Sequence, residues 1–260
     1  MTAAACPGVI GSVPIWRAAF FSTCHAYAHD VLAGRERPFT PPAFGLLVGR
    51  ARRFTSLVTQ MHVEVCGALQ PEAQRALSVF ATCHGEIQTC ERLITDFRDT
   101  STVSSARFAL SVHNTASGVY SVATGSTAPA TTVPGANAIA AGWLEASLIA
   151  LEAERPVLLS IADEPVPPVF QGPPEPVGFA AAFLLAAAPD AAGPGWTAEL
   201  EVVPREDPAH PEQAPGVDAL QVMARAADAC VRRAQETIAL GTIQPGALLT
   251  LRLAAAEARA

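Results

Sequence analysis

The sequence lacks an excess of basic residues, and this absence argues against one large class of functions. Its 17 lysine and arginine residues are outnumbered by 24 aspartate and glutamate residues, which gives a formal net charge of −7 at pH 7. A phosphate backbone is held mainly by a basic surface. We therefore expect no nucleic-acid partner.

Long hydrophobic runs are also missing. A membrane-spanning helix needs roughly 20 consecutive apolar residues, whereas the apolar segment at 178–189 is shorter and is closed by Pro189. We interpret that segment as a buried strand. Residues 1–16 have neither the basic start nor the apolar core of a signal peptide, which favours a cytoplasmic protein without a membrane span.

The six cysteines do not occur in the close pairs of a structural zinc site, and we expect reduced thiols rather than disulfides. His25 and His29 are four residues apart and could bind a metal on a helix. No second ligand pair follows, so one such pair is weak support for a site. We expect neither a metal nor a cofactor.

Half of the 260 residues are hydrophobic, which is enough for a compact body, and we treat 1–260 as a single domain. Alternating strands and helices with long apolar strands predict an α/β fold with a mostly parallel sheet covered by helices on both faces. A proline-rich loop is expected at 163–177 and a surface linker at 204–216. The predicted helices are 44–69, 85–99, 136–154 and 217–240, and the predicted strands are 76–83, 129–133, 156–163, 179–187, 196–204 and 247–255, with one more within 1–43.

The segment from Phe108 to Ala146 contains the most informative motif of the chain. A strand, PATTV, runs into a turn at Pro134 and Gly135, and an alanine-rich helix follows the turn. Asn137 lies at the start of that helix, where an asparagine side chain is a good N-terminal cap. The residues that anchor the motif upstream of the turn are Asn114, Ala116, Gly118, Gly125 and Pro129.

This pattern resembles the nucleophile region of β-ketoacyl-acyl-carrier-protein synthases, with Asn137 in the place of their cysteine. A carboxamide cannot accept an acyl chain. The resemblance is clearest over 49–170, where it includes HGEI at 84–87 and SVHN at 111–114, and it fades after Phe179. It implies a thiolase-like fold and roughly one half of a ketosynthase.

The same resemblance implies that catalysis is lost. Ketosynthases use two histidines from their C-terminal half, and the one histidine of this chain beyond residue 113 is His210, inside the proline-rich linker. A catalytic histidine needs a rigid position. We therefore expect no condensation by this chain alone, and no catalytic residue.

The family also implies a partner. Its members dimerise through the strand before the nucleophile turn, and residues of one subunit enter the acyl tunnel of the other. The leading hypothesis is a chain-length-factor-like subunit that forms a heterodimer with an active ketosynthase, meets an acyl carrier protein through that complex, and serves polyene or fatty-acid-type biosynthesis. The residues that this assigns to the interface or tunnel are Arg107, Phe108, Ser111, Asn114, Ala130, Thr131, Thr132 and Val133, with Phe108 as a stopper of chain growth.

Two enzymatic alternatives stay open. The first is a stand-alone acyl-thioester transferase or hydrolase that uses a cysteine such as Cys83, which precedes His84. Neighbouring residues on a strand point to opposite faces, which argues against a dyad of these two. The second is decarboxylation of malonyl groups assisted by the Asn137 amide.

Two further groups of charged residues have more ordinary interpretations. Arg50, Arg52 and Arg53 form a basic cluster that is either a solvated helix face or a docking site for a carrier protein. Glu145 and Asp163 form no evident acid/base pair. We expect both carboxylates at solvated or helix-capping positions.

Overall fold

The computed structural model describes residues 8–43, 45–153, 155–170, 177–185, 196–204, 215–244 and 247–255. Within them the strands form one eight-stranded sheet in the order β3-β2-β4-β5-β1-β6-β8-β7. The strands are β1 (Gly8–Ser22), β2 (Leu77–Thr82), β3 (Ala130–Pro134), β4 (Val157–Asp163), β5 (Phe179–Leu185), β6 (Trp196–Pro204), β7 (Glu236–Gln244) and β8 (Ala247–Ala255).

The sheet is mixed, and most of its neighbouring strands are antiparallel. β2 pairs in parallel with β3 and β4, whereas the pairs β4 with β5, β5 with β1, β1 with β6, β6 with β8 and β8 with β7 are antiparallel. The prediction of a mostly parallel sheet is therefore wrong. The prediction failed at β5, because every residue of this strand is buried and its sequence is a continuous apolar run. Burial on both faces produces such a run in parallel and antiparallel strands alike.

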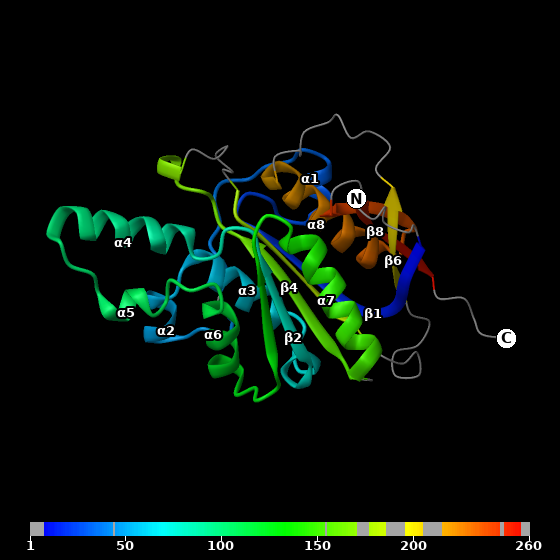
Figure 1. Cartoon of the computed structure of the whole chain (residues 1–260), viewed down its shortest axis with the longest axis horizontal. Helices are drawn as coiled ribbons and strands as arrows, with labels where there is room; N and C mark the ends of the chain where they lie inside the picture. Colours follow the sequence, from blue (N-terminus) through cyan, green and yellow to red (C-terminus); the bar gives the residue numbers. More distant parts are fainter. Residues whose placement is uncertain are drawn as a thin grey trace, which may run out of the picture.

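Helices cover the sheet on two faces (Figure 1). α1, α7 and α8 pack on one face around a core that includes Trp143 and Phe183. α3 and α6 pack on the other face around a second core that includes Met61 and Phe80. The helices are α1 (Ala28–Leu32), α2 (Gly49–Phe54), α3 (Leu57–Gly67), α4 (Ile87–Thr100), α5 (Ser105–Phe108), α6 (Thr115–Thr124), α7 (Ala138–Ala153) and α8 (Pro215–Arg232), with short 3₁₀ turns at Glu72–Arg75 and Pro168–Phe170.

β1 lies between the two halves of the sheet and joins them. Its first part pairs with β6, from Gly8 opposite Val202 to Ile15 opposite Trp196. Its second part pairs with β5, from Ile15 opposite Leu185 to Ser22 opposite Phe179, with a register shift between Ile15 and Arg17. One strand therefore belongs to both parts of the sheet.

Two predicted helices have different bounds in the structure. The helix expected at 44–69 is two helices, α2 and α3, because Ser56 adopts an extended backbone and its side chain accepts the N–H of Thr59 as a cap. The helix expected at 217–240 ends at Arg232, where Arg233 takes a positive φ of 54°, and the β-branched residues Thr237 and Ile238 continue as β7.

The other predicted elements that fall on described residues are present. Each predicted strand overlaps an observed one, and the helices expected at 85–99 and 136–154 are α4 and α7. α5 and α6 were not predicted, because α5 has only four residues and α6 is rich in serine, threonine and glycine. Of the expected loop and linker, 171–176 and 205–214 lie outside the described residues.

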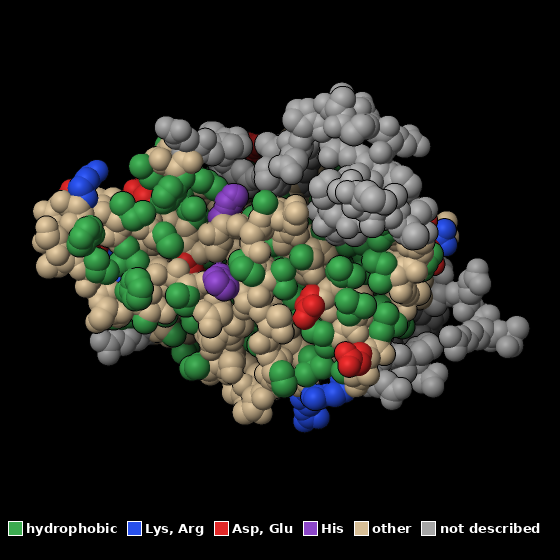
Figure 2. All heavy atoms as spheres, in the orientation of Figure 1, with side chains coloured by type: hydrophobic (Ala, Val, Ile, Leu, Met, Phe, Trp, Pro, Cys, Tyr) green, Lys and Arg blue, Asp and Glu red, His purple; other side chains and the backbone are tan. Residues whose placement is uncertain are grey.

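α4 and α5 extend away from the sheet (Figure 1), and we call residues 87–108 the α4–α5 arm. Leu93 is the one buried residue of α4, and α5 has none. Ile94, Phe97, Val103 and Phe108 are all exposed apolar side chains, and Figure 2 shows hydrophobic side chains at the surface in this region. The arm thus carries apolar surface that the described chain does not cover.

Candidate functional site

Three segments meet where the parallel strands end. Because β3, β2 and β4 are parallel, their carboxyl ends lie at the same edge of the sheet, which is where α/β proteins commonly place functional groups. The turn before α7 follows β3, Cys83 and His84 follow β2, and Glu164 follows Asp163 at the end of β4. The sequence motif and the buried carboxylates are therefore neighbours in space.

Asn137 occupies the turn that leads from β3 into α7. Gly135 takes a positive φ of 109°, which glycine adopts readily, and its N–H donates to the carbonyl of Thr82 at 3.1 Å. The carbonyl oxygen of Asn137 accepts the N–H of Ala141 at 2.9 Å. Its side chain is exposed and forms no hydrogen bond with the described residues. Asn137 therefore starts the helix through its backbone.

Asp163 is buried and braces the turn after β2. Its carboxylate accepts three hydrogen bonds, from Oγ1 of Thr82 at 2.8 Å and from the backbone N–H groups of Cys83 at 3.0 Å and His84 at 2.9 Å. Burial raises its pKa, and these hydrogen bonds act in the opposite direction. Cys83 and His84 precede α4, so Asp163 caps no helix, and because it is buried it is not solvated either; both expected positions of Asp163 are wrong. Glu145 is half-buried on α7.

Cys83 and His84 do not have the arrangement of a catalytic triad. Asp163 binds the backbone of both residues, so it does not orient the imidazole of His84 as a triad carboxylate would. Nδ1 of His84 is buried and has no hydrogen-bond partner among the described residues. Cys83 packs partly against the core beneath α7.

The residues predicted for a partner interface lie on two surfaces that α6 connects. On the first, Arg107 and Phe108 are exposed on α5, where Arg107 forms an ion pair with Asp96 of α4. Ser111 donates from Oγ to the carbonyl of Phe108 at 2.8 Å, and Asn114 is exposed at the start of α6.

The second surface is β3, which forms one edge of the sheet. Ala130 and Thr131 are exposed, and Thr132 and Val133 are half-buried. Oγ1 of Thr132 lies 3.4 Å from Oγ of Ser117 on α6. Because α6 contacts β3 in this way, the two surfaces are parts of one side of the molecule.

A buried polar cluster escaped the sequence prediction. Nδ1 of His62 lies 2.8 Å from Oγ of Ser160, and Cys66, one turn further along α3, also shares a hydrogen bond with Ser160. Burial lowers the pKa of His62 to about 3 and raises that of Cys66 to about 12. No substrate reaches these fully buried groups. The sequence feature that could have revealed this cluster is the i, i+4 spacing of His62 and Cys66 within one predicted helix.

The weaker candidates do not form sites in the described chain. His25 is buried beside Ser22 and precedes α1, so it does not share a helix with exposed His29, and the two do not form the helical pair that a metal site would need. Nowhere in the described residues do three or more His, Cys, Asp or Glu side chains gather as a metal site would require. Arg52 and Arg53 are exposed on α2, and the cysteines of the described ranges form no disulfide.

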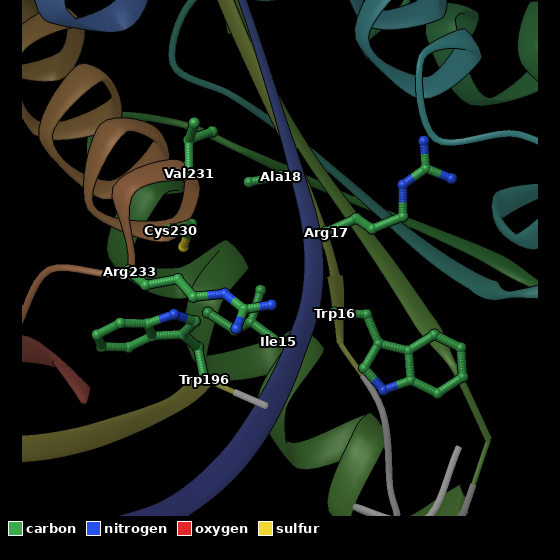
Figure 3. Close-up of a pocket in the computed structure, with 8 residues that line it drawn as sticks. All are labelled: Ile15, Trp16, Arg17, Ala18, Trp196, Cys230, Val231 and Arg233. Carbon is green, nitrogen blue, oxygen red and sulfur yellow. The ribbon is translucent and has the colours of Figure 1, made fainter. Parts of the chain in front are cut away.

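A cavity of about 250 Å³ lies near the register shift of β1 (Figure 3). Figure 3 shows Trp196 and Arg233 on one side of β1 and Trp16 on the other. Burial raises the pKa of the lining Cys230 to about 12, so its thiol is unreactive. The cavity does not belong to the strand-end site, since three strands separate β1 from β3.

The fold and the turn at Asn137 define a thiolase-like ketosynthase fold. The chain belongs to the family described as "Beta-ketoacyl synthase, N-terminal domain", whose sequence model matches residues 35–239. The expectation that the resemblance fades after Phe179 is therefore wrong. No helix among the described residues has both the length and the apolar composition needed to cross a membrane.

Solved structures of ketosynthase complexes are similar over nearly the whole chain. "Ketosynthase (ApeO) in Complex with its Chain Length Factor (ApeC) from Xenorhabdus doucetiae" contains a chain that is 17% identical, with a TM-score of 0.67 and coverage of 95% of this chain and 98% of that one. "The ishigamide ketosynthase/chain length factor" contains a chain that is 13% identical, with a TM-score of 0.69 and coverage of 94% of this chain and 99% of that one.

A third similar structure, "AntDE:AntF (apo): type II PKS acyl-carrier protein in complex with its ketosynthase bound to the hexaketide", is 11% identical with a TM-score of 0.67, covering 94% of this chain and 99% of that one. At these identities the similarity establishes the fold. No curated protein matches the sequence.

Proposed function

We propose that this chain is a non-catalytic, chain-length-factor-like subunit that forms a heterodimer with an active β-ketoacyl-acyl-carrier-protein synthase and shapes its acyl tunnel. The observation that carries the proposal is Asn137. The strand, turn and buried helix that resemble the nucleophile region are present, and by that resemblance the Asn137 amide stands in the place of the nucleophile. Because the Asn137 side chain cannot form a thioester, we assign the surrounding strand, turn and helix a structural role rather than a catalytic one.

The exposed side of the molecule supports a role in assembly. β3 has a neighbouring strand, β2, on one side, and within the described residues its other edge is unpaired. An unpaired edge offers backbone N–H and C=O groups to another chain. The apolar surface of the α4–α5 arm lies on the same side and gives a partner hydrophobic groups to bury.

In the proposed heterodimer the two chains contribute different groups. The partner supplies the cysteine and both histidines, and this chain supplies the edge strand and part of the tunnel wall. Phe108, exposed on α5, is the side chain that we assign to the tunnel end. The carrier protein would meet the assembled pair, in polyene or fatty-acid-type synthesis.

The proposal is tested by co-expression with a catalytically intact ketosynthase encoded beside this chain. We expect a stable heterodimer by size-exclusion chromatography with light scattering, and condensation that depends on the partner's cysteine. If this chain stays alone in the presence of that ketosynthase, the proposal is wrong.

A charge on the edge strand provides a matched pair of variants. Thr131→Lys places an ammonium group on exposed β3, and Thr237→Lys places the same group on exposed β7, at the opposite edge of the sheet. Lysine on an edge opposes strand pairing between chains. We expect Thr131→Lys to weaken heterodimer formation about tenfold or more, a change of roughly 1.4 kcal/mol, and Thr237→Lys to leave it unchanged.

The same variants allow a chemical readout, since the sequence contains no lysine. An amine-reactive crosslinker would attach to the single introduced side chain and otherwise only to an N-terminal amine. Capture of the partner from position 131 but not from position 237 would place the contact at β3.

A second function is favoured by the position of Cys83 at the strand-end edge, beside the turn that carries Asn137. There it could accept an acyl group from a thioester and act as a transferase or hydrolase. Incubation with a radiolabelled acyl thioester tests this. Covalent labelling that is lost in Cys83→Ser would support it, and absence of label would remove it.

A further inference from the structure

A cavity opens where the sheet divides at β1. β6 pairs with β1 from Gly8 to Ile15, where β6 itself begins with Trp196. Beyond Ile15 none of the described strands pairs with this edge of β1, because its remaining partner, β5, lies along the opposite edge. The C-terminal end of α8 lies there instead, and the cavity of about 250 Å³ lies between it, β1 and β6 (Figure 3). The end of one strand pairing therefore leaves room for a site.

The lining combines a buried apolar part with an exposed cation. Ile15 and Trp196 are 3% and 8% exposed, whereas Arg233 is exposed. The lining contains two arginines and no aspartate or glutamate. Arg17 extends from the opposite side of β1 in Figure 3 and forms an ion pair with Glu72 at 3.0 Å. Of the lining residues, Arg233 is therefore the one that brings a charge to the cavity.

The backbone of Arg233 has a conformation that usually selects glycine. Arg233 follows the last residue of α8 and has a φ of 54°. The N–H of Ala234 donates to the carbonyl of Ala229 at 3.0 Å, which is the bond that closes many helices whose next residue is left-handed. Glycine is the common residue at that position, because a Cβ is disfavoured there. An arginine at this position is therefore strained.

Contacts within the chain do not account for this arginine. Its side chain forms no hydrogen bond or ion pair with any described residue. In Figure 3 it extends across Trp196 toward β1. Strained residues that persist without a structural contribution are characteristic of functional sites. The Arg233 guanidinium is thus available to a ligand in the cavity.

A guanidinium group beside an indole favours a particular ligand chemistry. The planar guanidinium binds a carboxylate through two parallel hydrogen bonds. Trp196 and Ile15 offer apolar surface to a flat group. The volume of about 250 Å³ is below the range of about 300–1,000 Å³ that is usual for drug-sized ligands. The cavity therefore fits a small molecule with a single anionic group.

We propose that this cavity binds a small organic carboxylate with a flat apolar group. Arg233 binds the carboxylate, and Trp196 and Ile15 contact the apolar group. The site is separate from the strand-end edge, so the inference goes beyond the proposed subunit function and does not depend on it.

Isothermal titration calorimetry of the full chain with benzoate tests the site, because benzoate joins a carboxylate to a flat apolar ring. We expect saturable binding with a Kd of about 1 mM, as is reasonable for so small a ligand. Benzyl alcohol keeps the ring without the charge, and acetate keeps the charge without the ring; each should bind at least tenfold more weakly. Benzoate that does not saturate at ten times the expected Kd, or benzyl alcohol that binds equally well, would overturn the proposal.

Tryptophan signals report where benzoate binds. The indole Nε1–H signal of Trp196, assigned by its loss in Trp196→Phe, should shift during an NMR titration, because this ring lines the cavity. The signal of Trp143, which is fully buried on α7, should not. A titration that shifts Trp143 and leaves Trp196 unchanged would place the ligand elsewhere and contradict the site.

A matched pair of variants separates the ligand role of Arg233 from a structural one. Arg233→Gly should weaken benzoate binding about tenfold or more and raise the melting temperature, because glycine adopts a positive φ without strain. Arg53→Gln removes an exposed arginine from α2 and should bind benzoate like the unchanged protein. Full binding by Arg233→Gly would remove Arg233 from the site, and a lower melting temperature would show that Arg233 stabilises its own chain instead. If Arg233→Gly does not fold, the comparison of benzoate with benzyl alcohol in the unchanged protein decides.

Discussion

Strand β5 and the α4–α5 arm both carry apolar side chains, but those side chains have different surroundings. Every residue of β5 is buried between two helical layers. On the arm, Phe97 and Phe108 are 59% and 62% exposed. The fold therefore accounts for the apolar character of β5 and leaves that of the arm unexplained. Apolar side chains that do not stabilise their own chain mark a surface for something else.

The largest effect is expected from truncating the core. Phe183 of β5 is fully buried, and its ring centroid lies 4.7 Å from that of Trp143 on α7. Phe183→Ala should lower the free energy of unfolding by about 3–5 kcal/mol, because it leaves a cavity between packed layers. Urea denaturation measures this. Phe97→Ala, the matched change on the arm, should cost less than about 0.5 kcal/mol; equal losses would show that the arm is packed after all.

An intermediate effect is expected at the edge where the two regions meet. Asp163→Ala removes the acceptor of three hydrogen bonds at the base of the β2–α4 turn. Unpartnered buried donors cost about 1–3 kcal/mol, and the loss should appear in the same urea experiment. Glu145→Ala serves as the control, since no hydrogen bond of its side chain is found in the described chain. If Asp163→Ala leaves the free energy of unfolding unchanged, the β2–α4 turn is stable without these hydrogen bonds.

The smallest effect on stability and the sharpest effect on function are expected from Phe108→Ala. Because Phe108 is exposed, the free energy of unfolding should change by less than about 0.5 kcal/mol. In the proposed heterodimer the same change should lengthen the acyl products, as measured by mass spectrometry of carrier-bound chains, and Phe97→Ala should not. Products of unchanged length would remove Phe108 from the tunnel.

Much of the fold was visible in the sequence, and the failures have identifiable causes. β2, β4 and α7 were predictable from apolar runs and alanine content, and the motif around Asn137 led to the right family. Strand direction was not predictable, since a doubly buried strand has the same pattern in either direction. The break at Ser56 and the helix end at Arg233 depend on single residues within otherwise helical sequences.

The candidate site was only partly predictable. The motif located Asn137, but the role of Asp163 and Glu164 depends on backbone N–H groups that residue types do not reveal. Sequence patterns report side chains, whereas these carboxylates bind the main chain of segments about 80 and 106 residues away. The contacts of Glu164 therefore required a structure.

The position of β1 has a consequence for how the chain folds. Both neighbours of this strand come much later in the sequence, since Ser22 pairs with Phe179 and Gly8 with Val202. Contacts between distant residues require closure of long loops and slow the folding reaction. During synthesis β1 remains unpaired until β5 and β6 have left the ribosome. The centre of the finished sheet is therefore completed only late in synthesis, and in the meantime the strand is exposed to aggregation and to binding by chaperones.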